Sequence, residues 1–477
     1  MKANGRKLSG YSGIYTCHKY WGKKPPETLD RILTNFGFDD CKVLDPFLGA
    51  GIIAVLSSQK GFQFFGCDLN PSAVAISNVF LHPPSANEVL EVLGKIEEQC
   101  KDEILASYQG RDGTVASHIV WNEGHVDEVW MKQGRQTSLA DVNNWQDTNK
   151  ANTSKFQNVA DRVLKKNARI NVAEGQKVSD LFTTRAVENI DRLIGAIRQL
   201  KPEERKIANF ILTSAVGQMS KMVFALKRRR KTRNNCSKYE VGSWVIGYWL
   251  PKIHFEVNCW NVFEGRAKKL SNACSKMEQR TLLNSLSNGR TTIECRDAFE
   301  YMANFQNSSI DLIITDPPHN DRIPYLELSE MWNMMLGKKT NFSKEWVTSD
   351  SNGRDKNSKA YASQMHDFFS EATRILKDNG CLVLMFNCTD EKIWGKIREA
   401  YSSFDCLQFK GRFPLSYSAN SVVQDSRNGA LKIDWCLVFG KGGFKLPYNT
   451  KNNFTDWTDK WVADGHIQSW TPAKTPY

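Results

Sequence analysis

The sequence lacks the features that would place the protein in a membrane or outside the cell. No stretch of its 477 residues reaches the roughly 20 consecutive apolar residues of a membrane-spanning helix. The N-terminus, MKANGRKLSGYSG, has no apolar stretch of the kind found in secretory signals. The 12 cysteines include no Cys-x-x-Cys pair and no cysteine–histidine cluster at zinc-ligand spacing. We therefore expect a soluble, cytoplasmic protein with reduced thiols and no bound metal.

The composition is that of an ordinary globular protein with an excess of positive charge. Hydrophobic residues make up 41% and charged residues 24%, which at this length favours two or three structural units. Lysine and arginine number 64 against 52 aspartates and glutamates, giving a formal net charge of +12. This charge favours an anionic partner, with nucleic acid first and a membrane surface second.

The pattern of apolar runs predicts one α/β sheet whose strands come from two blocks of sequence. Residues 42–51 form an apolar run that ends in a glycine-rich turn, and residues 61–68 form a second run that ends in a carboxylate. An apolar helical segment follows each run, as in doubly wound α/β folds. The alternation resumes at residue 291. We expect strands at 292–295, 310–315, 381–386 and 431–439, and a helix at 365–377 stopped by Asp378-Asn-Gly380.

Between these blocks the sequence indicates a large, mostly helical insertion. Helical stripes cover 87–108, 187–200 and 203–226, whereas 113–131 and 240–255 are rich in β-branched and aromatic residues and are interpreted as hairpins. The polar stretch 141–155 is expected to be an exposed loop. We divide the chain into residues 1–87 and 291–445, the two halves of the sheet unit, residues 88–290, the insertion, and residues 446–477, a polar, Trp-rich tail.

The turn Asp45-Pro-Phe-Leu-Gly49-Ala-Gly51 is the first candidate for ligand binding. Glycines after a strand let the backbone approach a ligand closely, although many such turns bind nothing. Asp68 strengthens the pattern, because a carboxylate at the end of the next strand can accept both hydroxyls of a ribose. The sequence contains neither Gly-x-Gly-x-x-Gly nor the Gly-x-x-x-x-Gly-Lys phosphate loop. A nucleoside without a phosphate chain therefore fits better.

The turn Asp316-Pro-Pro-His319 is the second candidate. Two consecutive prolines fix the backbone beyond a buried strand and remove two N–H donors, which leaves carbonyl groups free. Such a turn can direct the Asp316 carboxylate and the Pro317 carbonyl at an amino group, while a planar side chain at position 319 stacks on the ring that carries it. Taken alone, a plain proline turn at a strand end is an equal alternative.

Taken together, the two turns resemble the DNA amino-methyltransferases, which use S-adenosylmethionine to methylate exocyclic base amines. The first turn is similar to their Asp-Pro-Phe-x-Gly-x-Gly cofactor motif, and the second to their Asp-Pro-Pro-Tyr catalytic motif, with histidine replacing tyrosine. His18-Lys-Tyr-Trp-Gly-Lys-Lys-Pro-Pro26 resembles the N-terminal cofactor segment of a subgroup with a Tyr-Trp-x-x-Lys-Pro signature. The resemblance covers roughly residues 13–87 and 291–440 and implies a Rossmann-like methyltransferase sheet interrupted by the insertion.

The resemblance also implies a role for each matched residue. Phe47, Gly49 and Gly51 would line the methionine part of S-adenosylmethionine, and Asp45 would face its ammonium group. Asp68 would bind the ribose, and Asp297 would meet the adenine amine. The N-terminal residues Lys19, Tyr20 and Trp21 would cover the cofactor. A base extruded from the duplex would meet Asp316, Pro317, Pro318 and His319. The methyl group would pass by direct displacement. The sequence has no Pro-Cys pair, the signature of C5-cytosine methylation.

The basic run Lys227-Arg-Arg-Arg-Lys-Thr-Arg233 in the insertion predicts double-stranded DNA as partner. Phosphate contacts would come from Lys227, Arg228, Arg229, Arg230, Lys231 and Arg233, with aromatic residues at 244–249 beside them. Arg412 and the loop at 424–427 are further candidates for substrate contact. The favoured product is N6-methyladenine, in a restriction-modification or phage-defence setting with a cognate nuclease. N4-methylcytosine, RNA guanine-N2 methylation, and a non-catalytic DNA-binding subunit with a vestigial cofactor pocket remain open.

Overall fold

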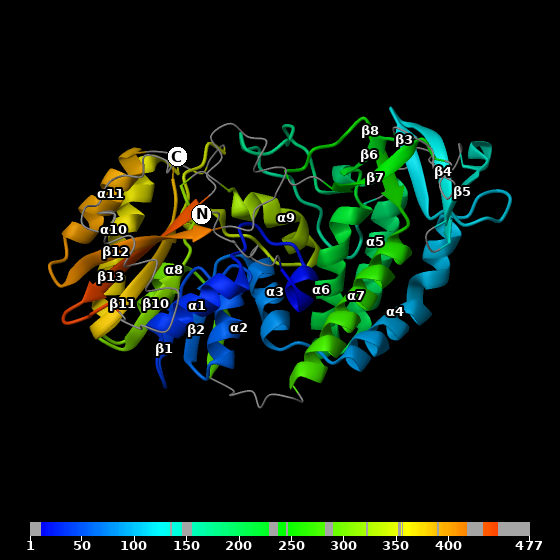
Figure 1. The fold of residues 1–477 in the computed structure, drawn as a ribbon. Coiled ribbons are helices and arrows are strands. Elements are labelled where there is room, and N and C mark those ends of the chain that lie inside the picture. The colour runs from blue at the N-terminus through cyan, green and yellow to red at the C-terminus, as the bar shows by residue number, and fades with distance from the viewer. Residues whose placement is uncertain are drawn as a thin grey trace, which may run out of the picture.

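The computed structural model describes residues 11–133, 136–145, 155–228, 237–244, 247–281, 290–320, 323–351, 354, 356–388, 391–416 and 433–446. Within these ranges the chain forms an α/β core and, beside it, the insertion (Figure 1). No helix in the described ranges combines the length and the apolar character needed to cross a bilayer.

The core is built on a seven-stranded sheet. Its strands are β1 (Lys42–Asp45), β2 (Gln63–Asp68), β9 (Thr291–Cys295), β10 (Ile310–Thr315), β11 (Leu376–Phe386), β12 (Leu407–Ser416) and β13 (Ile433–Lys441). They lie in the order β12-β13-β11-β10-β1-β2-β9. From β9 to β11 neighbouring strands are parallel, whereas β13 is antiparallel to both of its neighbours. Strands from both sides of the insertion thus share one sheet, which confirms the predicted Rossmann-like α/β fold.

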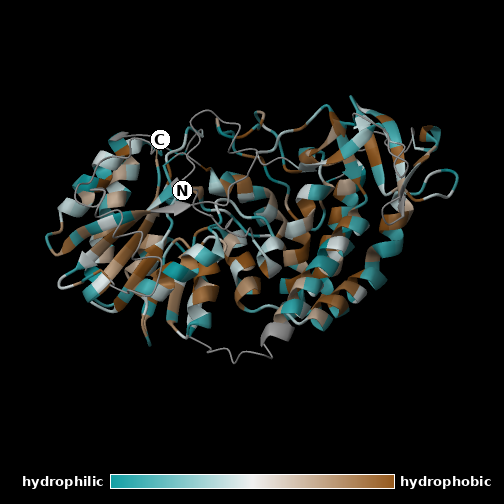
Figure 2. Cartoon of the chain, viewed as in Figure 1, coloured by the Kyte–Doolittle hydropathy of each residue, from teal (hydrophilic) through white to brown (hydrophobic). Residues whose placement is uncertain are grey.

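Helices cover both faces of this sheet. One face carries α1 (Pro26–Phe36) and α2 (Ile52–Gln59), and the other carries α8 (Ala298–Met302), α10 (Ser358–Ile375) and α11 (Glu391–Ser402). Because successive side chains of a strand point to opposite faces, Leu312 packs toward α1 and α2 while Ile313 packs toward α10. Strands buried on both faces are continuous apolar runs, and the core strands are accordingly largely brown in Figure 2.

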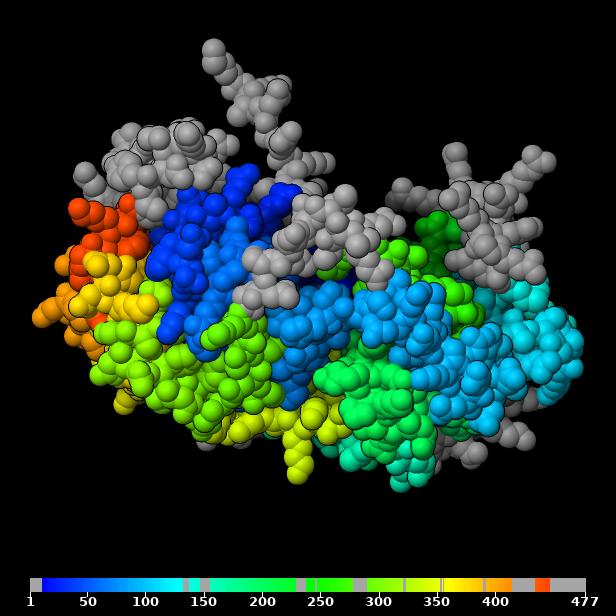
Figure 3. Space-filling model, turned by 90° about the horizontal axis from the view of Figure 1, so that it is seen from below, coloured from blue at the N-terminus to red at the C-terminus, as the bar shows by residue number. Residues whose placement is uncertain are grey.

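The two ends of the core lie side by side although they are far apart in sequence. Phe36 of α1 stacks on Phe444, which follows β13, with ring centroids 6.5 Å apart. In the space-filling view, N-terminal residues in dark blue border C-terminal residues in orange and red (Figure 3). The first helix is therefore held by the last strands of the sheet.

The junction between α10 and β11 differs from the prediction of a helix ending at residue 377 and a strand starting at 381. The helix ends at Ile375 and the strand begins at the next residue, so Asp378-Asn-Gly380 lies within the strand. The register jumps from Ile310 opposite Leu376 to Leu312 opposite Cys381, and Asn379 adopts a φ of 70°. The turn-forming residues therefore make a bulge in a long strand instead of ending a helix.

The insertion consists, in its described part, of long helices beneath a six-stranded antiparallel sheet. The helices are α4 (Ala86–Ser107), α5 (Thr184–Gln199), α6 (Pro202–Val216) and α7 (Cys259–Thr281). The strands are β3 (His118–Asn122), β4 (His125–Gln133), β5 (Gln136–Ala140), β6 (Val223–Lys227), β7 (Tyr239–Trp244) and β8 (Ile253–Val257), in the order β5-β4-β3-β8-β6-β7. Short 3-10 turns occur at Gly13–Thr16, Val142–Asn144, Ser179–Leu181, Gly217–Met219 and Phe342–Lys344.

Two of the predictions for the insertion are wrong in part. The helix expected over 203–226 ends at Val216, and its last residues form β6 instead. Gly217 begins a 3-10 turn directly after the helix and lies against Trp244 of β7, where an added Cβ would be 2.5 Å from the indole ring. The 113–131 hairpin is confirmed as β3 paired with β4. The one expected over 240–255 is not a hairpin, since β7 pairs with β6, and β8 with β3 and β6. Part of the expected loop, residues 146–154, lies outside the described residues.

A continuous apolar core joins the insertion to the α/β unit. It includes residues of α3 (Pro71–Leu81) and α9 (Tyr325–Met335) together with the insertion helices. Trp21, from the segment before α1, stacks on Trp332 of α9 at 4.8 Å and meets Trp244 of β7 edge-on at 6.2 Å. The N-terminal segment therefore lies in the seam between the two units.

Candidate active site

The candidate site lies where the direction of strand order reverses in the core sheet. β1 has β2 on one side and β10, which comes more than 240 residues later in the chain, on the other. Crevices outside the carboxyl ends of strands at such a switch point are the usual ligand sites of open α/β sheets. Here the loops after β1 and β10 border one cavity of about 940 Å³, its open mouth included. Of the predicted site residues, those lining it are Tyr20, Trp21, Asp45, Phe47, Gly49, Asp68, Asp297, Asp316 and Pro318.

The turn after β1 brings its glycines close to both Tyr20 and α3. Gly49 and Gly51 have φ values of 53° and 71°, in the left-handed region that favours glycine. A Cβ at Gly49 would lie 3.5 Å from the Tyr20 ring, and one at Gly51 only 2.5 Å from the Ser77 side chain on α3. Gly51 does not line the cavity but lets α3 pack against the turn, and Ser77 Oγ donates a hydrogen bond to the Gly49 carbonyl at 3.1 Å.

Asp68 is fixed by the backbone on either side of the cavity. One of its oxygens accepts a hydrogen bond from the Gly49 N–H and the other from the Asn70 N–H, both at 2.8 Å. Burial raises the pKa of Asp68 to about 6, although these two hydrogen bonds work in the opposite direction. The carboxylate thus holds the glycine turn and faces the cavity at the end of β2.

Asp45 links the ends of β1 and β10. Thr315 Oγ1 donates a hydrogen bond to its Oδ1 at 2.6 Å, and the Phe47 N–H donates another at 3.1 Å. The carboxyl group is 1% exposed, and burial raises its pKa to about 7. Its bonds therefore bring the two predicted motifs into direct contact.

Asp297 lies at the end of β9 beside an aromatic wall. Its side chain caps α8 by accepting hydrogen bonds from the N–H groups of Phe299 and Glu300, at 3.1 and 3.0 Å. Trp346 lies 5.4 Å from the Phe47 ring and 6.0 Å from the Phe299 ring, measured between centroids. These three aromatic residues line the cavity, so this end offers flat apolar surfaces next to a carboxylate.

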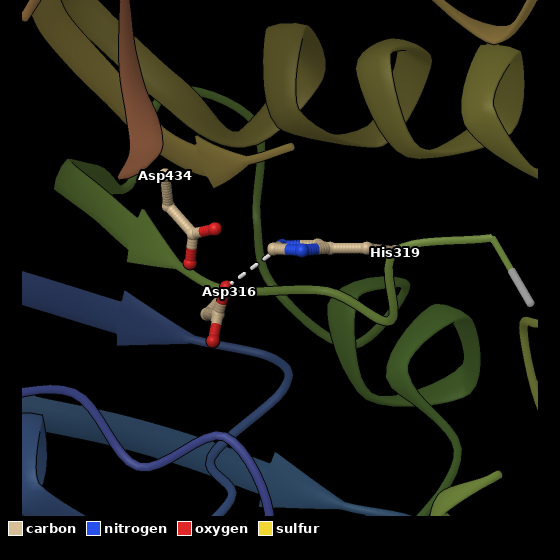
Figure 4. A group of neighbouring side chains, drawn as sticks. All are labelled: Asp316, His319 and Asp434. Carbon is tan, nitrogen blue, oxygen red and sulfur yellow. Dashed lines mark hydrogen bonds and ion pairs between the residues drawn. The ribbon is translucent and has the colours of Figure 1, made fainter. Parts of the chain in front are cut away.

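The turn after β10 forms a buried charged cluster (Figure 4). Lys24 Nζ lies 2.8 Å from Asp316 Oδ2 and 2.6 Å from Asp434 Oδ2 on β13. His319 Nε2 lies 3.0 Å from Asp316 Oδ1, the pair joined by the dashed line in the figure. Side-chain atoms of Asp316, His319 and Asp434 lie within 4.8 Å of one another, a spacing that suits a cation. The Lys24 ammonium is the cation that this structure pairs with both carboxylates.

His319 packs into the protein instead of lining the cavity. It is 6% exposed, its ring meets Phe386 at 4.9 Å, and its Nε2 also lies 3.2 Å from the Met385 carbonyl of β11. Pro317 likewise is not among the lining residues, and the Pro318 carbonyl accepts a hydrogen bond from Tyr361 at 2.8 Å. The histidine is thus held beside the Asp316 carboxylate by the neighbouring strand.

The N-terminal segment covers one wall of the cavity. Tyr20 lines it, stacks on Tyr325 at 6.4 Å, and accepts a hydrogen bond from Asn70 Nδ2 at 3.3 Å. Lys19 points toward the insertion instead, since its Nζ lies 4.4 Å from the centre of the Trp244 ring and 3.3 Å from Ser243 Oγ. Burial lowers the pKa of this lysine.

Sequence reasoning overlooked several residues of the site. Lys24 is the lysine of the Tyr-Trp-x-x-Lys-Pro signature, so the sequence did point to it. Asp434 is a single acid within an apolar strand, and a buried acid is rare without a partner. Glu345 lines the cavity and carried no signal. Burial and the nearby Glu327 raise its pKa to about 7, although an ion pair with Arg354 opposes this shift.

The predicted DNA contacts are described only in part. Lys227 ends β6 and is exposed, and Arg228 Nε lies 3.4 Å from Glu240 Oε1 on β7. Arg229, Arg230, Lys231 and Arg233 lie outside the described residues, as do the loop at 424–427 and the tail beyond residue 446. Arg412 is buried, with its guanidinium 4.6 Å from the centre of the Trp435 ring. It is therefore part of the packing between β12 and β13.

Neither a protein-family model nor a curated protein matches the sequence. Among solved structures, a provisionally named DNA modification methylase from Thermus thermophilus aligns over 33% of this chain and 57% of its own length, with 14% identity and a TM-score of 0.20. A provisionally named SAM-dependent methyltransferase from Streptococcus mutans aligns over 75% of this chain and 82% of its own, with 11% identity and a TM-score of 0.19. At such scores a functional assignment has to rest on the geometry of the site itself.

Proposed function

We propose that the protein is an S-adenosylmethionine-dependent DNA methyltransferase that methylates an exocyclic base amine, with adenine N6 as the favoured target. The observation that carries this proposal is the convergence of two separate turns on one cavity. Thr315 and Asp45 are hydrogen-bonded across the ends of adjacent strands, and both Gly49 and Asp316 line the same space. A donor bound at the first turn and an acceptor at the second would therefore meet.

The chemistry of the cavity supports S-adenosylmethionine as the ligand. The cavity volume of about 940 Å³ is at the upper end of the range of small-molecule sites. Asp68 and Asp45 are carboxylates suited to hydroxyl and ammonium groups, and the wall formed by Phe47, Phe299 and Trp346 suits a planar ring. Asp297, which also lines the cavity, would meet the amine of that ring. Because the ligand carries positive charge, several acids along the cavity favour it electrostatically.

In the proposed mechanism the chain binds and orients, and the bound S-adenosylmethionine supplies a methyl group on a sulfonium. The Asp316 carboxylate, which lines the cavity, accepts a hydrogen of the target amine and so makes the nitrogen lone pair more available. The methyl group would pass from sulfur to nitrogen as its C–S bond breaks, leaving S-adenosylhomocysteine, and Asp316 would take the proton that the nitrogen loses. Alignment of the two reactants by the turns after β1 and β10 supplies much of the rate.

The insertion supports DNA as the substrate. The chain carries a net charge of +12. The first two residues of the basic run, Lys227 and Arg228, lie at and just after the end of β6, and another lysine, Lys238, lies just before β7. The last residue of β7, Trp244, contacts Trp21 of the cavity wall. Lys227 pairs with Tyr239 at the other end of β7 from Trp244. A duplex would therefore extend along these two strands to bring an extruded base to the cavity. We further propose a cytoplasmic role in restriction-modification or phage defence, beside a nuclease.

One observation favours a second candidate function, that of a non-catalytic DNA-binding subunit. Both oxygens of Asp316 already have partners, His319 at Oδ1 and Lys24 at Oδ2. In addition, His319 is packed against Phe386 instead of presenting its face to the cavity. A carboxylate engaged in this way is held firmly, but it has fewer positions left for a target amine.

Transfer of a radiolabelled methyl group separates the two candidates. The full chain is incubated with tritiated S-adenosylmethionine and with unmethylated genomic duplex DNA, transfer RNA or no acceptor. We expect label in duplex DNA, and nucleoside mass spectrometry of the product to identify N6-methyladenine. N4-methylcytosine as product would change the target base but keep the enzyme class. Label in transfer RNA alone would identify RNA, and not DNA, as the substrate. Binding of duplex DNA without any transfer would favour the non-catalytic subunit.

A further inference from the structure

Lys24 is a buried amine with two acidic partners at the candidate site. It is 6% exposed, and Asp434 on β13 is 0% exposed. Charged side chains are almost never buried to this extent without a partner. The pairing joins positions 410 residues apart in the chain, and it lies on the wall of the cavity, which Lys24 and Asp316 both line.

The lysine stays charged in this cluster. Burial alone would lower the pKa of Lys24, but the attraction of Asp316 and Asp434 more than offsets it and raises that pKa above its usual value. One ammonium is therefore shared between two carboxylates. Asp434 is enclosed in the sheet, whereas the side chain of Asp316 is 18% exposed. Of the two acids, Asp316 is the one that a ligand in the cavity can reach.

We propose that Lys24, held in place by Asp434, is a positioning residue for Asp316, which fixes the rotamer of this carboxylate relative to the target amine. The inference rests on the proposed methyltransferase function and deepens it. With Lys24 at Oδ2 and His319 at Oδ1, the plane of the carboxylate is set from two directions. Lys24 itself transfers no atom. Its effect reaches the amine through Asp316, as expected for a group that supports an acceptor.

The alternative is that the Lys24–Asp434 pair only fastens the N-terminal segment to β13. A double substitution separates the two roles. Lys24→Met alone leaves two buried carboxylates without their shared cation and lowers the melting temperature. Adding Asp434→Asn removes one of these charges and restores much of the melting temperature, because replacing a buried ion pair by neutral groups costs far less than breaking it. The double variant, however, still lacks the Lys24 ammonium beside Asp316.

The experiment measures melting temperature and the kinetics of methyl transfer from S-adenosylmethionine to unmethylated genomic duplex DNA. For both Lys24→Met and the double variant we expect kcat to fall about 100-fold, with KM for S-adenosylmethionine within about threefold, the loss typical of a misplaced reacting group. Lys377→Met is the matched control. Lys377 pairs with Asp311 at 2.8 Å on the same strand as the Asp316 turn, but at its opposite end, so kcat should stay within about twofold.

Three outcomes overturn the inference. Recovery of kcat together with melting temperature in the double variant would assign Lys24 a structural role alone. If Lys24→Met does not fold, the kinetics of Asp434→Asn are measured instead, because this variant keeps one cation, Lys24, paired with one carboxylate, Asp316. A change in its kcat no larger than that of the Lys377→Met control then removes the proposal. If the unaltered protein transfers no methyl group to DNA, the proposed function fails and the inference with it, a result distinct from an active protein that is insensitive to Lys24.

Discussion

The two sheets of this protein place their side chains in different ways. In the core sheet, parallel strands end at a common edge, so that Asp45, Asp68 and Asp316 meet around one cavity although the chain leaves the core and returns between them. In the insertion, every described strand pairing is antiparallel, and successive strand ends fall on opposite edges. The comparison indicates that the parallel sheet brings the acidic side chains of the candidate site together, whereas the antiparallel sheet presents a surface.

The N-terminal segment joins these two regions. Lys19 contacts Trp244 and Ser243 of β7, Trp21 packs between the two units, and Lys24 reaches Asp316. Six residues of chain thus connect the surface of the insertion with the charged cluster in the core. Each of the following predictions tests whether the two regions have separate roles.

The largest effect is expected from Asp316, which follows β10, in comparison with Asp311 near the other end of the same strand. Asp316→Asn should lower kcat for methyl transfer about 1,000-fold, because the amide cannot accept the proton of the target amine. Asp311→Asn, at the other end of β10 beside Lys377, should leave kcat within about twofold. Affinity for S-adenosylhomocysteine, measured by calorimetry, should change by no more than a few-fold in either variant. An equal loss of cofactor affinity in Asp316→Asn would mean that Asp316 contacts the cofactor and not the target base.

Two glycines compare the stability of the core and the insertion. Gly51→Ala should lower the free energy of unfolding by about 2–3 kcal/mol, because its φ of 71° disfavours a side chain and its Cβ would meet Ser77 at 2.5 Å. Gly94→Ala, within α4 and with no atom within 4 Å of the added Cβ, should raise it by up to about 1 kcal/mol. Denaturant unfolding without ligand measures both. A neutral Gly51→Ala would mean that the turn relaxes easily.

Removing positive charge from the basic run should weaken binding without touching the chemistry. Replacing Arg228, Arg229 and Arg230 by Ala should weaken the affinity for duplex DNA about 10–30-fold for all sequences, and should reduce the slope of log affinity against log salt by up to about 0.9 for each lost phosphate contact. Cofactor affinity should not change. Lys206→Ala, at an exposed position on α6, is the control. An unaltered salt slope in the triple variant would place the phosphate contacts elsewhere.

The smallest effect concerns pH and the acids of the core. Burial raises the pKa of Asp45 to about 7 in the folded protein, against about 3.9 when unfolded. The folded state then binds a proton that the unfolded state has released, so the contribution of Asp45 to stability falls as pH rises from about 4 to 7. Ligand binding should follow the opposite trend, because the ionised carboxylate attracts an ammonium. We expect S-adenosylhomocysteine to bind up to about tenfold more tightly at pH 7.5 than at pH 5.5. Asp45→Asn should reduce this dependence, and Asp68, whose pKa burial raises to about 6, accounts for the remainder.

The sequence predicts the core better than the contacts that complete it. Strands β1, β2 and β10 were predictable because each is an apolar run ending at an aspartate or just before one, and these acids meet where parallel strands end. β12 was not predicted, since LQFKGRFPLS carries charges and a proline that edge strands tolerate. The Lys24–Asp434 pair could not be foreseen, because it depends on which strand lies next to β11. The position of the His319 ring was set by Phe386 and Met385, on a strand 66 residues away.

The place where the insertion leaves and rejoins the core has a practical consequence. The chain departs after α3 and returns at β9, the edge strand of the sheet, which has β2 as its one neighbour there. An exchange of the intervening segment for one from another protein would therefore disturb a single strand pairing and spare the switch point. Any such graft would also have to cover the apolar faces of α3 and α9, which share one core with the insertion, and offer a surface for Lys19 and Trp21.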